Sequence, residues 1–286
     1  MNRYIEALTK VTIHPLFWAV IAIGVLTAHF KELLVLFGIV LVHELGHGLA
    51  AAHFRWRIKR IQLLPFGGVA ELEEHGNKPL KEECIVVLAG PLQHIWMGLA
   101  VYGLYTGGCI SEASYSFFMW NNMTIFFFNL LPIWPLDGGK LVLNIYSAFV
   151  PFLQAHRLTL LTSGACFLGL TVAALLWNAS NVTMWIVVIF LAVSLYLEWK
   201  QRQYIFVRFL LERYYGKKRD IEKLTLINAN ANDPLYTVFM QFRRGYKHSV
   251  VIKGKERQQY TLDENELLYA YFTEKRISSS IGELIS

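Results

Sequence analysis

Apolar residues dominate this chain in long runs that polar residues rarely interrupt. The run 33–52 is twenty residues long, which is the length that a helix needs to cross the hydrocarbon core of a bilayer. This pattern predicts a mainly α-helical, polytopic membrane protein with six transmembrane helices. The other five predicted spans lie near residues 16–29, 83–105, 116–131, 158–177 and 182–199.

The second predicted span carries the polar sequence His43-Glu44-Leu-Gly-His47 near its centre. On a helix, positions i and i+4 share a face, so the two imidazoles can bind one zinc ion with Glu44 beside them as a general base. Soluble helices match this motif by chance, and most such matches bind nothing. Lipid makes the same side chains costly, and polar residues there are usually functional. The setting therefore indicates a metal site.

A catalytic zinc site needs a third protein ligand and one open position. Asp137 follows two prolines and precedes two glycines in an apolar stretch. Such a broken segment is tolerated at membrane depth only where it is buried in protein or lines a cavity. We therefore favour Asp137 as the third ligand. Three alternatives remain: Asp137 could cap the next helix, the ligand could come from the polar loop 71–75, or His94 could be a ligand rather than a hydrogen-bonded structural residue.

Residues 61–73 predict a β-hairpin, because apolar runs flank Pro-Phe-Gly-Gly. A bare hairpin cannot lie in lipid with open edges, so we expect it to be sheltered by protein beside the second span. Its free edge could bind an extended substrate, with Phe66 and Gly67 as candidate substrate-binding residues. The equally weighted alternative is an ordinary loop hairpin that has no role in substrate binding.

Composition supports the membrane assignment and restricts the partners. Only 17% of the 286 residues are charged, against about 25% in soluble domains. The net charge of +6 could indicate nucleic-acid binding, but the basic residues lie in loops beside apolar segments. We therefore expect no nucleic-acid partner, and the positive-inside rule places both termini in the cytoplasm. The three cysteines are scattered, which favours neither disulfides nor a cysteine zinc site.

The composition changes near residue 200 and predicts three regions. Residues 1–200 form a transmembrane domain, 201–220 a charged and aromatic linker helix, and 221–286 a small soluble α/β domain. The N-terminal stretch 1–13 reads as a short amphipathic lead-in, without a removable signal sequence.

The two polar motifs together resemble those of the site-2 protease family of intramembrane zinc metalloproteases. That family combines a His-Glu-x-x-His helix with a distant Asn-x-x-Pro-x-Pro-x-Leu-Asp-Gly. The second motif occurs here as Asn129-Leu-Leu-Pro132-Ile-Trp-Pro135-Leu-Asp137-Gly138, with two residues rather than one between the prolines.

The resemblance implies a role for each matching residue. His43, His47 and Asp137 would bind zinc, and Glu44 would activate its water. Asn129 and Pro135, from the second motif, would help to hold the substrate.

Four further segments are similar to the sporulation branch of that family: 64–68, 74–77, 89–96 and 208–216. This similarity spans essentially the full length of the chain. That similarity implies cleavage of the N-terminal pro-sequence of a membrane-associated pro-sigma factor, inhibition by partner membrane proteins, and residence in the membrane around the forespore, on the mother-cell side. The C-terminal domain resembles a single cystathionine-β-synthase (CBS) motif. Such motifs work in pairs and often bind adenine nucleotides, which implies homo-oligomerisation and ATP binding.

We therefore predict a zinc metalloendopeptidase that acts within the membrane. One alternative is a membrane zinc transporter or sensor that uses the same ligands, although it leaves Glu44 without a necessary role. A second alternative is an inactive scaffold that binds tethered proteins through the hairpin and the CBS-like domain. The complete set of candidate ligands and base argues against the scaffold.

Overall fold

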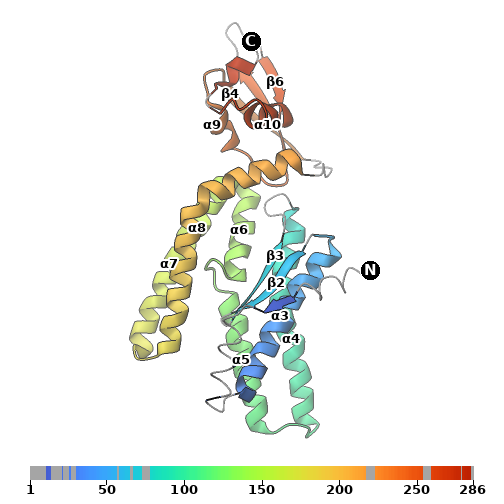
Figure 1. Cartoon of the computed structure of the whole chain (residues 1–286), viewed down its shortest axis with the longest axis vertical. Helices are drawn as coiled ribbons and strands as arrows, with labels where there is room; N and C mark the ends of the chain where they lie inside the picture. Colours follow the sequence, from blue (N-terminus) through green and yellow to red (C-terminus); the bar gives the residue numbers. More distant parts are fainter. Residues whose placement is uncertain are drawn as a thin grey trace. The chain divides into compact units, whose positions relative to one another are not determined.

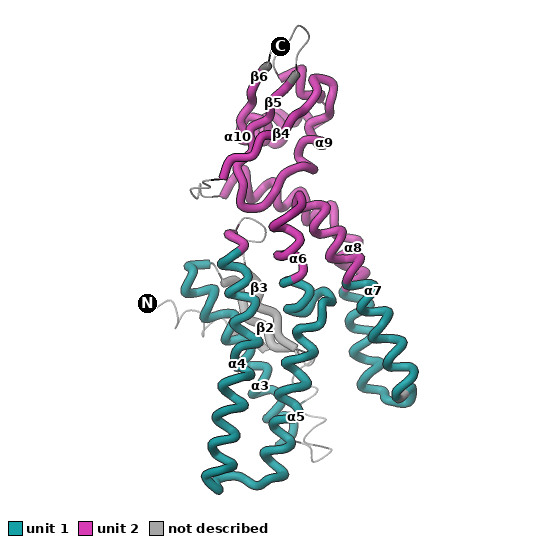
Figure 2. The backbone as a smooth tube through the Cα atoms, turned by 180° about the vertical axis from the view of Figure 1, so that it is seen from behind, with its two compact units in different colours: residues 1–74, 81–141, 163–194 teal, residues 75–80, 142–162, 195–286 magenta. Residues whose placement is uncertain are grey.

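The chain forms two compact units, which are described separately (Figure 2). Unit 1 comprises residues 1–74, 81–141 and 163–194, and unit 2 comprises residues 75–80, 142–162 and 195–286. The computed structural model describes residues 11–13, 21, 26, 30–56, 58–64, 67–72, 78–216, 223–253, 259–277 and 279–284. The division by composition at residues 200 and 220 stays a prediction, because compact units follow contacts rather than composition.

Within the described residues, four helices are long and apolar enough to cross a membrane: α3 (Phe30–His53), α4 (Leu80–Thr106), α7 (Phe152–Asn178) and α8 (Val182–Tyr215). They correspond to the second, third, fifth and sixth predicted spans. The fourth predicted span is the helix α5 (Glu112–Asn129), which does not meet the same criterion. Most of the first predicted span lies outside the described residues, so the number six stays a prediction.

A small sheet lies beside α3 in unit 1 (Figure 1). Strands β2 (Ile58–Leu64) and β3 (Gly67–Leu72) pair antiparallel, which confirms the predicted hairpin. Strand β1 (Val11–Ile13) adds to β2 in parallel, so the order is β1-β2-β3. The sequence expectation of an amphipathic lead-in missed β1, although Val-Thr-Ile is a β-branched run that favours a strand.

The helix α6 (Asp137–Phe149) begins at the candidate ligand Asp137. The segment 130–136 connects it to α5. A Cβ atom on Gly138 would lie 2.2 Å from the carbonyl oxygen of Leu130, so only glycine lets the first turn of α6 pack on this segment. The backbone N–H of Trp134 donates to Ser163 Oγ at 3.1 Å, which fixes the segment to α7.

Unit 2 contains a second sheet, of order β4-β5-β6, with β4 parallel to β5 and β5 antiparallel to β6. Its core is apolar and includes Phe206, Phe209 and Leu210 from the last part of α8. The helix α8 continues without a break to Tyr215. The sixth predicted span and most of the predicted linker helix 201–220 therefore belong to the same helix. The elements after α8 are β4 (Leu224–Asn230), α9 (Leu235–Phe239), β5 (Lys247–Lys253), β6 (Gln259–Asp263), α10 (Glu264–Phe272) and a 3-10 turn (Ile281–Leu284).

A buried polar network joins the end of α8 to β5 and α10 within unit 2. The guanidinium of Arg213 donates to both carboxylate oxygens of Glu264 and to the carbonyls of Arg243 and Tyr246. His248 Nδ1 donates to Glu264 Oε2 at 2.9 Å, and its Nε2 accepts from the backbone N–H of Arg243. Every member is therefore satisfied, which a buried network requires if it is to stabilise a fold.

This network makes the stability of the C-terminal part of unit 2 sensitive to acid. Burial raises the pKa of Glu264, but the hydrogen bond from His248 and the charge of Arg213 outweigh burial and lower that pKa to about 2. Burial, the largest cause, and the charge of Arg213 lower the pKa of His248 against its hydrogen bond to Glu264. The unfolded chain, with ordinary values of about 6.5 and 4.3, therefore binds more protons in acid. The contribution of the network to the free energy of unfolding is therefore fully present above about pH 6.5, and it is lost progressively as the pH falls toward 2.

We expect hydrogen exchange in β5 and α10, corrected for the intrinsic rate, to be faster at pH 4.5 than at pH 7 in the full chain. His248→Gln should reduce the difference, because His248, whose ordinary pKa is about 6.5, is the group that titrates between these two pH values. Glu274→Gln, which removes an exposed partner of Arg276, should leave it unchanged. Equal protection at the two pH values would contradict the expectation.

Candidate active site

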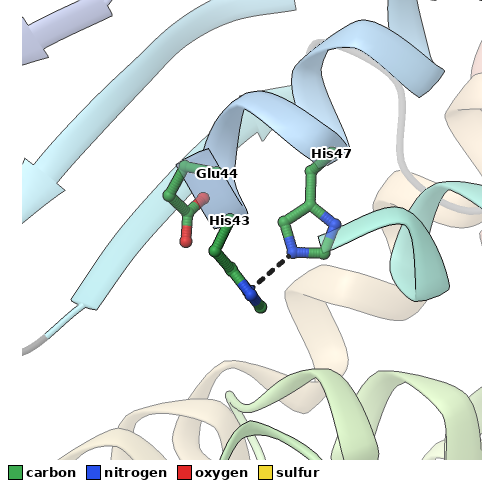
Figure 3. A group of neighbouring side chains, drawn as sticks. All are labelled: His43, Glu44 and His47. Carbon is green, nitrogen blue, oxygen red and sulfur yellow. Dashed lines mark hydrogen bonds between the residues drawn. The ribbon is translucent and has the colours of Figure 1, made fainter. Parts of the chain in front are cut away.

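The residues His43, Glu44 and His47 project from one region of α3 and are all buried, with 3%, 5% and 6% of their surfaces exposed (Figure 3). The two imidazole rings are nearly perpendicular to each other, with Nε2 atoms 3.1 Å apart. The ligand atoms of all three residues lie within 4.8 Å of one another. The helical spacing thus places the motif as the sequence predicted, within the protein rather than on a solvated surface.

The helix α6 brings Asp137 to the same point. Its Oδ2 atom lies 3.1 Å from His43 Nε2 and 3.0 Å from His47 Nε2, and only 3% of the residue is exposed. This placement favours the ligand interpretation over the helix cap. Among the alternative ligands, residues 73–75 and the side chain of Glu71 lie outside the described structure. The role of Asp137 as a metal ligand stays a prediction.

The atoms His43 Nε2, His47 Nε2 and Asp137 Oδ2 have the chemistry and spacing of a zinc site. A tetrahedral ion with bonds of about 2.0–2.1 Å holds its ligands about 3.3–3.4 Å apart, close to the observed 3.0–3.1 Å. His47 Nδ1 donates to the carbonyl of Val86 at 2.8 Å, so His47 Nε2 presents a lone pair in the neutral ring. A carboxylate oxygen only accepts. Converging lone pairs repel unless a cation lies between them, so the residues fit the metal.

A glycine on α4 makes room for one of the histidines. A Cβ atom on Gly90 would lie 2.2 Å from His47 Nε2 and 2.4 Å from its Cε1. A Cβ atom on Gly46, one residue before His47, would lie 2.5 Å from the carbonyl oxygen of Ala89. The two helices therefore approach closely beside the cluster of His43, Glu44 and His47, and this approach depends on glycine in both of them.

Several polar groups contact the three candidate ligands from outside. Lys140 Nζ donates to Asp137 Oδ1 at 3.1 Å and leaves Oδ2 for the histidines. His43 Nδ1 lies 3.0 Å from Nε2 of His94, a fully buried residue of α4. His94 Nδ1 lies 2.7 Å from Asn122 Oδ1. Both ring nitrogens of His94 thus have partners, which supports its hydrogen-bonded role over the ligand alternative.

Sequence reasoning missed Asn122, and a signal for it was present. Asn122 is the one residue of α5 that is buried, and in the fourth predicted span it lies next to Asn121 between the apolar runs 117–120 and 125–128. A polar side chain within such a segment is a candidate for function by the argument already applied to His43.

The candidate substrate-binding residues receive no test from this geometry. Asn129 ends α5, and its Nδ2 donates to the carbonyl of Ile125 in the same helix at 3.0 Å. Pro135 is half-buried in the segment before α6. Gly67 begins β3 opposite Leu64, and Phe66 lies outside the described residues. Their roles stay predictions.

Known proteins are similar to this chain in sequence and in fold. The sequence profile of peptidase family M50 matches residues 31–111 and 108–171. The chain is 50% identical over 285 residues to stage IV sporulation protein FB of Bacillus subtilis, covering 100% of this chain and 99% of that protein. It is 27% identical over 186 residues to a zinc metalloprotease of Methanocaldococcus jannaschii, covering 64% of this chain and 49% of the other.

A solved structure of the site-2 protease from Methanocaldococcus jannaschii has the same fold. It aligns with a TM-score of 0.50 and 24% sequence identity, over 68% of this chain and 87% of that one. Because the identity is low, this likeness concerns the fold alone.

Proposed function

Because the chain belongs to peptidase family M50 and is an intramembrane zinc metalloprotease, we propose that it hydrolyses a peptide bond at the cluster formed by His43, Glu44, His47 and Asp137. The observation that supports this assignment of residues is the triangle of ligand atoms, with sides of 3.0–3.1 Å, that α3 and α6 form beside Glu44. A transporter built on the same three ligands would not need a buried carboxylate next to them.

Each residue has a defined part in hydrolysis. His43, His47 and Asp137 would hold a zinc ion, and Lys140 fixes the carboxylate of Asp137. When bound, zinc lowers the pKa of its water toward about 7 and polarises the scissile carbonyl. The Glu44 carboxylate accepts a proton from the attacking water and donates it to the leaving amine. Burial of all four site residues strengthens these charge interactions relative to water.

The hairpin supplies the surface on which the substrate is extended. A helix hides its peptide carbonyls, so the substrate must be locally extended before hydrolysis. Strand β3 lies at the edge of the described sheet, beside α3, and an edge strand can pair with an extended segment. Asn129, Pro135, Phe66 and Gly67 would hold the substrate near this edge.

The sporulation relative directs the choice of substrate. We propose the N-terminal pro-sequence of a membrane-associated pro-sigma factor, with cleavage restrained by inhibitory membrane proteins. Both termini would lie in the cytoplasm, on the mother-cell side of the membrane around the forespore, and all six spans would cross it. The β-α-β-β-α order after α8 is compatible with a CBS-like domain. Pairing between copies and ATP binding there rest on resemblance.

The test measures zinc content and cleavage of a membrane-tethered pro-sequence by the purified full chain. We expect about one zinc ion per chain in the native protein. Asp137→Ala should lose zinc and cleavage together, whereas Glu112→Ala, which removes an exposed carboxylate from α5, should keep both. Full zinc content in Asp137→Ala would place the third ligand elsewhere. Zinc without cleavage in the native chain, together with zinc flux into vesicles, would favour the transporter.

A further inference from the structure

A chain of hydrogen bonds leads away from the metal cluster across two helices. His43 Nδ1 and His94 Nε2 are 3.0 Å apart, and His94 Nδ1 and Asn122 Oδ1 are 2.7 Å apart. His94 and Asn122 are both fully buried. These hydrogen bonds therefore connect a residue of α3 to residues of α4 and α5, and water has no access to His94 or Asn122.

The donor and the acceptor in each of these hydrogen bonds can be assigned by starting from Asn122. Asn122 Nδ2 donates to the backbone carbonyl of His94 at 2.9 Å. A carbonyl only accepts, so this bond fixes the orientation of the amide, and Asn122 Oδ1 must face His94 Nδ1. Since Oδ1 is also only an acceptor, His94 Nδ1 carries the proton. The neutral His94 ring then presents a lone pair at Nε2.

The same reasoning assigns the tautomer of His43. His94 Nε2 can only accept, so His43 Nδ1 carries a proton and donates it. His43 Nε2 is then bare and directed at His47 Nε2 and Asp137 Oδ2. A second proton on His94 would reverse this order, but it would place a charge on a fully buried ring.

We infer that Asn122 and His94 are positioning residues that hold His43 in the tautomer whose Nε2 binds zinc. This inference rests on the proposed zinc site and goes beyond it, since neither residue touches the metal position. A hydrogen-bonded partner on the second nitrogen of a ligating histidine fixes the ring and raises its basicity. His47 has a simpler partner, the Val86 carbonyl. The two histidines thus reach the same tautomer by different means.

Two substitutions of Asn122 separate this role from packing. Leucine has nearly the same volume but accepts no hydrogen bond, so His94 can rotate or change tautomer. Aspartate keeps an acceptor for His94 Nδ1. A purely structural role would favour leucine, because an additional buried carboxylate is costly. The positioning role predicts the opposite order of zinc affinity. Asn121→Leu is the matched control, since Asn121 donates to Phe117 in its own helix.

The measurement is the zinc dissociation constant of the full chain in detergent, obtained by competition with a chromophoric chelator. We expect Asn122→Leu to raise it about 10–100-fold, and Asn122→Asp and Asn121→Leu to stay within about threefold of the native value. The visible spectrum of the cobalt-substituted protein should change in Asn122→Leu alone, because the geometry at His43 changes.

Each outcome distinguishes this inference from the proposed function. No zinc binding by the native chain would overturn the proposed function. Native zinc binding with unchanged affinity in Asn122→Leu would overturn only the positioning role. A loss in Asn122→Asp at least as large as that in Asn122→Leu would also overturn it, because a hydrogen-bond acceptor at position 122 would then not preserve zinc affinity.

Discussion

Glu44→Gln is expected to lower the rate of peptide cleavage by about 10²–10⁴-fold, which is the usual contribution of a general base. Glutamine has nearly the same size and remains buried beside His43 and His47, but it cannot accept the proton of the attacking water. Zinc content should be unchanged, because the proposed ligand triangle consists of the two histidines and Asp137. The measurement combines single-turnover cleavage with metal analysis of the same preparation.

One control variant and the metal analysis separate loss of the base from other losses. Glu112→Gln removes an exposed carboxylate from α5 and should cleave at the native rate. Loss of zinc in Glu44→Gln would show that Glu44 is a ligand. Cleavage at the native rate by the same variant would refute its role as general base.

The part of the site that follows from local spacing was predictable from the sequence. His43, Glu44 and His47 lie within one turn of one helix, so their juxtaposition needs only helical geometry. The hairpin 58–72 was predictable for the same reason, because its two strands are neighbours in the chain. Asp137 required one further argument, the cost of an isolated carboxylate in an apolar segment.

The remainder depends on contacts between distant segments. Strand β1 pairs with β2 across more than forty intervening residues, and no local pattern reports such pairing. Asn122 is separated from His94 by 28 positions, so its role emerges only when α4 and α5 are packed together. The contribution of α8 to the core of unit 2 was hidden because the composition changes near residue 200 although the helix continues.

Glycine at position 90 shows how packing completes what the motif begins. The His-Glu-x-x-His spacing brings His43 and His47 to one face of α3, but it does not ensure that the neighbouring helix leaves space for their rings. A Cβ atom at position 90 would lie 2.2 Å from His47 Nε2, the atom that we propose as a metal ligand. A real Cβ never approaches so closely, so either the ring or α4 must move.

We therefore expect Gly90→Ala to reduce zinc binding by at least about 100-fold and to abolish detectable cleavage, since displacement of a ligand exceeds the 10–100-fold effect of losing its outer partner. Gly103→Ala is the matched control on the same helix, because a Cβ atom there would meet nothing within 4 Å. It should bind zinc and cleave as the native chain does. Chelator competition, with circular dichroism to verify the helical content, measures both variants. Native zinc affinity in a folded Gly90→Ala protein would show that α4 moves aside without cost, and that this glycine does not set the position of His47.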